Sequence, residues 1–304
     1  MINRPLLLIL ALGIGSPITA AADLRVVTTL PDLATVARAV GGGHIEVTSL
    51  ARSTEDPHHV DARPSFIREL NRADILIHGG AELEIGWLPP LVRNARNANI
   101  LNGRDGNIDA SDGLTLLDVP TGPIDRSMGD VHPGGNPHYL LDPLNAKALA
   151  NALAERFARL DPSNASSYQS NSKKFGDAIT ARLEEWTRIL EPHRDTRVIS
   201  YHKSHDYFLE RFELKSAGTI ETKPGIEPSP AHITRLIESL RPAKVRLVLM
   251  EPFRSPRTPA YVAEALNASL LALPLFPGST HPAETYLEWM DHLVTETDRA
   301  LKAP

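Results

Sequence analysis

A long helical pattern in the middle of the chain constrains the fold more than any other stretch. Between residues 161 and 190, apolar side chains recur three, four or seven positions apart, at Tyr168, Phe175, Ile179, Leu183, Trp186 and Leu190. Asp161 and Pro162 suit the N-cap and first position of a helix, and Pro192 ends the pattern. A helix of about 29 residues is about 43 Å long at about 1.5 Å per residue. We expect either a rigid strut that joins two lobes or a long surface helix of one domain.

Strand-like and helical segments alternate on both sides of this pattern. Before it, β-rich runs at 24–30, 45–50, 74–78 and 99–101 are separated by helical patterns at 31–40, 63–71 and 84–95. Residues 102–137 are rich in Gly, Asp and Pro, so we expect a loop there, with 114–119 as a candidate edge strand. A helix that starts at Asp142 and Pro143 leads into the long one. Beyond it, runs at 197–201, 214–220, 245–250 and 270–275 alternate with helical patterns at 204–212, 230–240, 259–266 and 284–301.

This alternation predicts an α/β fold with two lobes, each a mostly parallel sheet flanked by helices, joined by the long rigid helix. The expected boundaries are a signal peptide at 1–22, an N-terminal lobe at 23–160, the linking helix at 161–192 and a C-terminal lobe at 193–304. Ligands of open α/β sheets bind beyond the carboxyl ends of the strands. A site is therefore expected between the lobes, on residues that follow strands.

The N-terminal segment indicates export. Arg4 precedes an apolar run at 6–14, and Ala20, Ala21 and Ala22 offer small residues for cleavage, so we expect a secretory signal and a periplasmic protein. The alternative is a buried N-terminal helix. The sequence contains no Cys, which excludes disulfides, thiolate ligands and a lipid anchor on Cys. Any metal must then be held by His and carboxylates.

The overall charge gives no case for nucleic-acid binding. The formal net charge is −5, and we find no basic stripe with interleaved aromatic residues. The hydrophobic fraction of 42% and the charged fraction of 23% are ordinary for a soluble globular protein. We expect a monomer.

Histidines follow predicted strands in both halves of the chain. Twelve His are present; His58 and His59 follow the second strand, and His202 and His205 follow the first strand of the second half. His138 directly precedes a helix. Imidazole is the commonest biological ligand for zinc and related divalent metals. A single loop His is usually a surface residue, so the argument depends on several of them converging in one cleft.

Five motifs resemble those of a known family. They are D-P-H at 56–58 with P-S at 64–65, N-P-H through L-D-P at 136–143, Y-H-K-S at 201–204 with Y-F and R-F at 207–212, G-I-E-P-S-P at 225–230, and M-E-P at 250–252. They cover nearly the whole chain after the signal, and together they are specific. The chain resembles the metal-binding solute-binding proteins of zinc and manganese ABC importers (cluster A-I), most of all the zinc-binding members. The resemblance implies two α/β lobes joined by a long helix, with the metal bound between them.

The same resemblance places three metal ligands on His58, His138 and His202. Many family members carry an Asp just before Pro-Leu as the fourth ligand, and Leu273 occupies that place here. Glu251, at the end of an apolar strand, is the tentative fourth ligand; its other reading is a structural carboxylate that pins a neighbouring loop. A water molecule or His281 could also take the position.

Three further histidines lie beside these ligands in the sequence. His132 is on the loop that leads to His138, where the resemblance suggests that zinc-binding members carry acidic, His-rich loops. It is read either as a ligand that captures or transfers metal or as part of a plain loop. His59 and His205 each neighbour a proposed ligand, and each could hold metal transiently, bond a carboxylate or simply face solvent.

Three imidazoles and one oxygen ligand suit tetrahedral Zn²⁺, whereas Mn²⁺ prefers more oxygen. We therefore expect a binding protein that captures Zn²⁺ and delivers it to an ABC permease driven by an ATPase, with a periplasmic metallochaperone as a further candidate partner. A manganese-binding homologue is the nearest alternative. A secreted zinc hydrolase with Glu251 as base, or an adhesin or stress protein with structural metal, belongs to other classes. The chain has no H-E-x-x-H motif, which argues against the hydrolase.

Overall fold

Two parallel sheets with the same strand order form the framework. The computed structural model describes residues 24–122, 129 and 131–303, so the predicted signal peptide lies outside the described residues. The first sheet has the order β2-β1-β3-β4, and its strands are β1 (Leu24–Thr28), β2 (Ile45–Ser49), β3 (Ile75–His78) and β4 (Asn107–Asp109). The second has the order β6-β5-β7-β8, with β5 (Arg197–Ser200), β6 (Lys215–Thr219), β7 (Leu247–Met250) and β8 (Ser269–Ala272). The predicted α/β class is confirmed.

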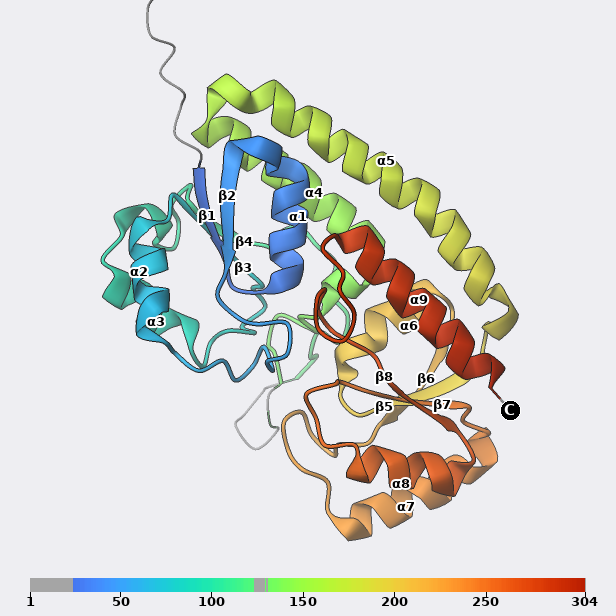
Figure 1. The fold of residues 1–304 in the computed structure, drawn as a ribbon. Helices are drawn as coiled ribbons and strands as arrows, with labels where there is room; N and C mark the ends of the chain where they lie inside the picture. The colour runs from blue at the N-terminus through green and yellow to red at the C-terminus, as the bar shows by residue number, and fades with distance from the viewer. Residues whose placement is uncertain (1–23, 123–128, 130, 304) are drawn as a thin grey trace, which may run out of the picture.

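Helices cover both sheets (Figure 1). They are α1 (Pro31–Gly41), α2 (Pro64–Arg72), α3 (Leu88–Ala95), α4 (Pro143–Leu160), α5 (Ala165–Leu190), α6 (Asp206–Arg211), α7 (Pro230–Leu240), α8 (Arg257–Leu266) and α9 (Tyr286–Lys302). Proline begins several of them, because its fixed φ suits the first helical position. Asp142 also caps α4 by accepting a hydrogen bond from the Leu144 N–H. The helix start predicted at Asp142 and Pro143 is therefore confirmed.

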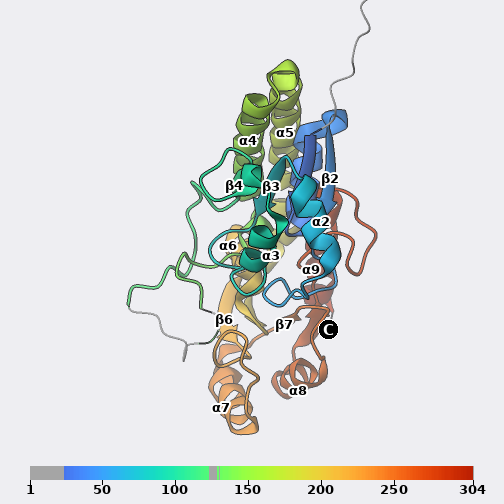
Figure 2. The same cartoon turned by 90° about the vertical axis from the view of Figure 1, so that its left-hand side faces the viewer.

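Apolar side chains on the two faces of the second sheet pack against different helices. One face packs Ile199 and Val248 against Ile237 of α7 and Val262 of α8. The other face joins a larger apolar cluster that also includes Trp289 of α9 and side chains of the first sheet. Seen edge-on, α4 and α5 lie at one end of the molecule, and α7 and α8 lie at the other (Figure 2).

The long helix α5 runs beside both halves of the chain (Figure 1). Tyr168, Phe175, Ile179, Trp186 and Leu190 of the predicted stripe are buried, and Leu183 is partly buried against the same core. The helix packs against α4, α1 and α9. Its N-terminus differs from the expectation: a 3₁₀ turn, Pro162–Asn164, comes first. The Asp161 carboxylate accepts hydrogen bonds from Asn164 and the Tyr168 hydroxyl, which favours this turn over a simple N-cap.

Three local predictions in the first half are wrong. Residues 98–100 form a 3₁₀ turn (Ala98–Ile100) because the Asn97 side chain accepts from the Asn99 N–H and donates to two carbonyls of the neighbouring segment. The fourth strand is β4 instead, inside the predicted loop, where a single apolar residue, Ile108, gave no alternating pattern. Residues 114–119 form no strand, since the Leu117 amide donates to the Tyr207 hydroxyl and its carbonyl accepts from Asn136.

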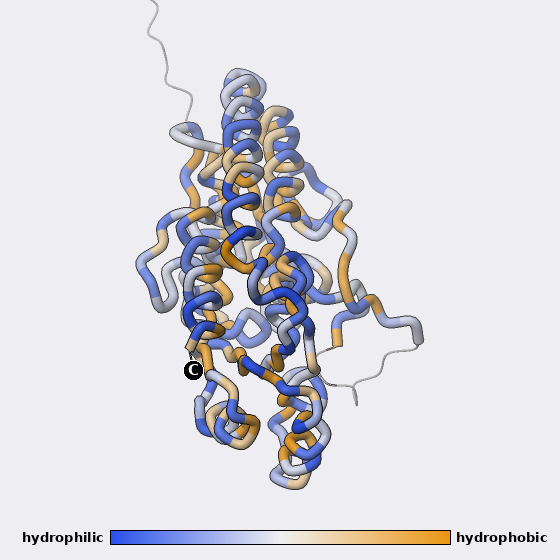
Figure 3. Tube along the Cα trace, turned by 90° about the vertical axis from the view of Figure 1, so that its right-hand side faces the viewer, coloured by the Kyte–Doolittle hydropathy of each residue, from blue (hydrophilic) through white to orange (hydrophobic). Residues whose placement is uncertain are grey.

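A smaller difference concerns the helix expected at 84–95. It begins only at Leu88, after turns in which Ala81 and Glu82 have positive φ. In the part of the chain that the structure describes, each helix is too short or too polar to cross a bilayer. The hydropathy colours agree, because hydrophilic and hydrophobic residues alternate along the helices (Figure 3).

Candidate metal centre

Three histidines from separate parts of the chain meet between the two sheets. His58 lies on the loop after β2, His138 on the turn before α4, and His202 directly after β5. One ring nitrogen from each lies within 4.8 Å of the others. The ring centroids are 5.4 Å apart for His58 and His138, 5.3 Å for His58 and His202, and 5.5 Å for His138 and His202. The structure thus brings together the three histidines that the sequence singled out as ligands.

A carboxylate orients His58. The Asp56 Oδ1 atom lies 2.8 Å from His58 Nδ1 and also accepts the His58 backbone N–H at 3.0 Å. An ionised carboxylate only accepts, so Nδ1 carries the proton and Nε2 keeps its lone pair for a metal. Burial opposes the charge on Asp56, but contacts with His58 and with Arg254, 3.6 Å away, hold its pKa below the usual range.

A second carboxylate, which the sequence analysis missed, orients His202. Glu221 follows β6 and bonds His202 Nδ1, and it also accepts the Gly225 N–H. Burial, together with the neighbouring His58, lowers the pKa of His202 to about 3. Burial also raises the pKa of Glu221 to about 7, an effect that Arg254 opposes. A neutral His202 that donates from Nδ1 to Glu221 presents Nε2 to a metal. A charged residue directly after the apolar Ile220 was the only signal in the sequence.

His138 supplies an unsatisfied ring nitrogen. Its side chain is buried, and its Nε2 has no hydrogen-bond partner among the described residues. Burial and then the nearby His58 and His202 lower its pKa, so the ring stays neutral. Buried polar atoms are rarely left unpaired. A metal ion bound to Nε2 would satisfy this atom, so the donors present fit a divalent metal.

The loops of His138 and His202 are tied to each other. Asn136 accepts the His138 N–H and donates from its amide to the Lys203 carbonyl at 2.8 Å. The Tyr207 hydroxyl donates to the Asn136 carbonyl at 2.7 Å. Arg211 also makes two hydrogen bonds to Asp142, at 2.7 and 2.5 Å. These contacts hold two of the three imidazoles at a set separation.

Glu251 lies outside the three-histidine cluster. It is fully buried at the end of β7, where Oε1 accepts the Ser204 hydroxyl at 2.7 Å and Oε2 accepts Arg254 Nε at 2.9 Å. Burial raises its pKa, but His205, His202 and Arg254 together bring the pKa below the ordinary value. Ligation by Glu251 would require one of these bonds to be exchanged for the metal.

The remaining candidate histidines occupy different places. His281 stacks on His292 of α9, with ring centroids 4.6 Å apart, outside the cluster. His205 is buried, and its Nε2 lies 3.1 Å from the carbonyl of Leu273, the buried residue at the position where the family resemblance leads us to expect an Asp. The exposed His59 has its ring 6.3 Å from that of His58.

His132 lies at the edge of the cluster. Its Nε2 is 3.2 Å from His58 Nε2, and the two ring centroids are 5.2 Å apart. It lines a cavity of about 180 Å³ together with His202 and Asn136. The sequence analysis left open whether His132 captures metal or belongs to a plain loop. The structure shows that this loop brings an imidazole to the site.

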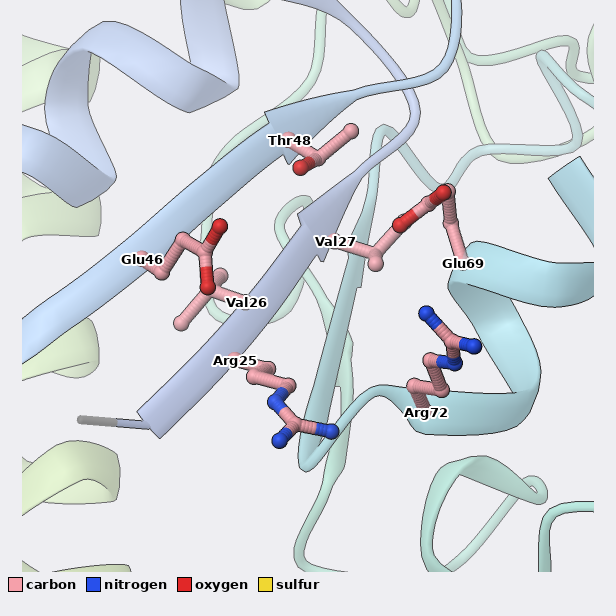
Figure 4. A pocket seen from close by; sticks show the side chains of 7 residues that line it. All are labelled: Arg25, Val26, Val27, Glu46, Thr48, Glu69 and Arg72. Atoms are coloured by element: carbon pink, nitrogen blue, oxygen red, sulfur yellow. The ribbon is translucent and has the colours of Figure 1, made fainter. Parts of the chain in front are cut away.

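A larger hollow, of about 490 Å³, lies elsewhere (Figure 4). Arg25 and Glu46 project into it from β1 and β2, and Glu69 and Arg72 project from α2. Charges of both signs line it, and none of the predicted metal ligands does. The group of potential metal ligands found among the described residues is instead the cluster of His58, His138 and His202.

The fold and the histidine cluster define a metal-binding protein of the solute-binding class. A family model described as the periplasmic zinc-uptake complex component A (ZnuA) matches residues 26–300, and the chain belongs to this family. The family is one of transport binding proteins and not of enzymes. The predicted resemblance to this class is confirmed.

Relatives that are named for different metals are similar to the chain. The high-affinity zinc uptake system protein ZnuA of Paracoccus denitrificans is 29% identical, over 94% of this chain and 94% of that protein. The manganese ABC transporter substrate-binding lipoprotein PsaA of Streptococcus pneumoniae is 26% identical, over 87% of this chain and 84% of that protein.

Solved structures agree with the fold. A crystal structure of ZnuA superposes with a TM-score of 0.75 at 23% identity, over 92% of this chain and 100% of that one. The Mn-bound periplasmic metal binding protein from Candidatus Liberibacter asiaticus gives 0.74 at 20% identity, over 92% of this chain and 100% of that one. At these identities the structures establish the fold alone.

Proposed function

We propose that the protein captures Zn²⁺ in the periplasm through His58, His138 and His202 and delivers it to an ABC permease driven by an ATPase. The observation that carries this proposal is the cluster of three imidazoles, two of them oriented by carboxylates. The chemistry is ligand exchange, since metal binding displaces only protons and water from these rings.

The surroundings of the cluster favour zinc over manganese. Mn²⁺ prefers oxygen ligands, and three carboxylates lie near the site. Asp56 and Glu221 bond the Nδ1 atoms of the histidines, and Glu251 bonds Ser204 and Arg254. A donor set dominated by nitrogen remains, and tetrahedral Zn²⁺ accepts such a set.

The rest of the transport assignment extends this proposal. Family membership and the expected signal peptide at 1–22 support a periplasmic location. The names of the relatives, a zinc uptake system protein and an ABC transporter lipoprotein, support a permease and an ATPase as partners. We also keep the division into lobes at 23–160 and 193–304 around the linking helix 161–192, a monomeric state, and a metallochaperone as a candidate donor of zinc.

Metal content and competitive titration of the purified mature protein test the function. We expect one Zn²⁺ per chain, bound more tightly than Mn²⁺, with His202→Ala and His138→Ala each greatly weakening it. Glu251→Ala in parallel tests the tentative fourth ligand, with metal-free unfolding curves to separate ligation from folding. Preference for Mn²⁺, or full zinc affinity after loss of His202, would overturn the proposal.

A further inference from the structure

The contact between His58 and His132 has the geometry of two ligands of one metal. Zinc–imidazole bonds of about 2.0–2.1 Å in a tetrahedral site put neighbouring ligand nitrogens about 3.3 Å apart. The two Nε2 atoms lie 3.2 Å apart. They therefore already have the separation that a shared tetrahedral ion requires.

The tautomer of His58 decides which nitrogen of the pair donates. Asp56 keeps the proton of a neutral His58 ring on Nδ1, so His58 Nε2 accepts and His132 Nε2 donates. When a metal binds His58 Nε2, the proton on His132 Nε2 must move to its own Nδ1 or to solvent. His132 Nε2 then has a lone pair next to the same ion.

The loop presents His132 through its own backbone. The His132 carbonyl accepts the Gly135 N–H at 3.1 Å, which closes a turn four residues long. Gly135 has a φ of 110°, and a Cβ there would meet the Leu117 carbonyl oxygen at 2.7 Å, so a side chain is excluded. This turn connects His132 to Asn136 and thus to the bonds that hold His138.

The other candidates for the fourth position are engaged or absent. Both Glu251 oxygens bond protein groups, His281 stacks on His292, and Leu273 is a buried apolar residue. His132, like these residues, is not part of the group of three histidines, but its ring contacts that of His58 and it helps to lower the pKa of His138.

We propose that His132 is the fourth ligand, completing a site of four imidazoles around the bound metal. This inference rests on the proposed function and gives a reason for the preference for zinc. A site of four imidazoles disfavours Mn²⁺ more strongly than a site of three imidazoles and one oxygen does. The ionised Asp56 carboxylate, bonded to His58, balances part of the charge of the ion.

X-ray absorption at the zinc edge tests the ligand count directly. We expect four imidazoles in the wild-type zinc protein and three imidazoles with one oxygen in His132→Ala. His59→Ala is the matched control, because it removes an exposed neighbouring ring and should keep four imidazoles. Visible absorption of the Co²⁺-loaded proteins gives a second measure of coordination number.

Competitive titration of the same proteins measures the consequence. His132→Ala should lose more than the roughly 10–100-fold in zinc affinity that a hydrogen-bond partner of a ligand contributes, with little change for Mn²⁺. H132D should recover zinc binding in part and raise Mn²⁺ affinity, because it supplies oxygen. Unfolding curves of the metal-free proteins should coincide, since His132 lies on a partly exposed loop.

The outcomes separate the two proposals. Three imidazoles in the wild type, or unchanged zinc affinity in His132→Ala with His202→Ala still defective, would overturn only the role of His132. If the wild type binds no zinc, or if His202→Ala binds it normally, both the fourth ligand and the proposed function fail.

Discussion

The Arg254 guanidinium lies 3.6 Å from the Asp56 carboxylate, and this ion pair joins the loop of His58 to the loop after β7. The same guanidinium donates to Glu251 and lies over the Tyr201 ring, 4.9 Å from its centroid. It also faces Glu221 electrostatically. One cation therefore acts on both carboxylates that orient proposed metal ligands, His58 and His202, one in each half of the chain.

Replacing Arg254 should disturb two ligands at once. We expect Arg254→Met to weaken zinc binding about 10–100-fold, since Asp56 loses a partner and His58 its fixed orientation. Because Glu251 is left buried with an unpaired charge, the metal-free protein should also lose about 3–5 kcal/mol of stability. Zinc competition and urea unfolding measure the two effects. Arg257→Ala, at an exposed neighbouring position, is the control, and equal effects in both variants would contradict the prediction.

Glu221 should matter for affinity although it does not touch the metal. Glu221→Gln keeps an oxygen that can accept from His202 Nδ1 but removes the charge, so we expect about a 10-fold loss of zinc affinity. Glu221→Ala removes the acceptor as well and should lose up to about 100-fold. The exposed Glu227, which bonds Tyr201, provides the control Glu227→Gln. Wild-type affinity in Glu221→Ala would show that His202 is oriented by other contacts.

Asp32 should make the metal-free protein less stable as the pH rises. Burial raises its pKa to about 7 from the ordinary value of 3.8, so the folded chain holds a proton that the unfolded chain has already lost. Between these values the free energy of unfolding falls with pH, by at most about 1.4 kcal/mol per unit.

The variant Asp32→Asn cannot ionise, so it tests this effect. Its stability relative to the wild type should increase from pH 5 to pH 8, as measured by chemical denaturation at both values. The amide oxygen can still accept the Leu33 N–H that Asp32 accepts at 2.8 Å. A constant difference between the two proteins at pH 5 and pH 8 would refute the assignment.

Zinc binding should change the overall shape little. The long helix α5 packs against α9, where Asp291 accepts Arg182 and the Trp186 indole, each at 2.7 Å. Asn136 and Lys203 link the two loops that carry His138 and His202. We therefore expect similar small-angle scattering from the metal-free and zinc-bound proteins. A marked compaction on adding zinc would show that these ties break and that the lobes close.

Much of the fold follows from local patterns. The spacing from Tyr168 to Leu190 predicted α5, and the helices predicted from Pro31 and Pro230 begin at these prolines, because both signals depend on residues only a few positions apart. The strand β4 was not predicted, because its three residues include only one apolar side chain. Its pairing with β3 depends on a segment that is far away in the sequence.

The candidate site divides in the same way. Position after strands indicated His58 and His202, and the family-like motifs added His138. Their partners were out of reach: Glu221 lies 19 residues from His202, and His132 lies 74 residues from His58. The sequence by itself determines the residue types and their local spacing. The contact between His58 Nε2 and His132 Nε2 and the Asp56–Arg254 ion pair depend on how loops that are far apart in sequence pack. Only the tertiary structure, through that packing, decides which polar atoms face one another.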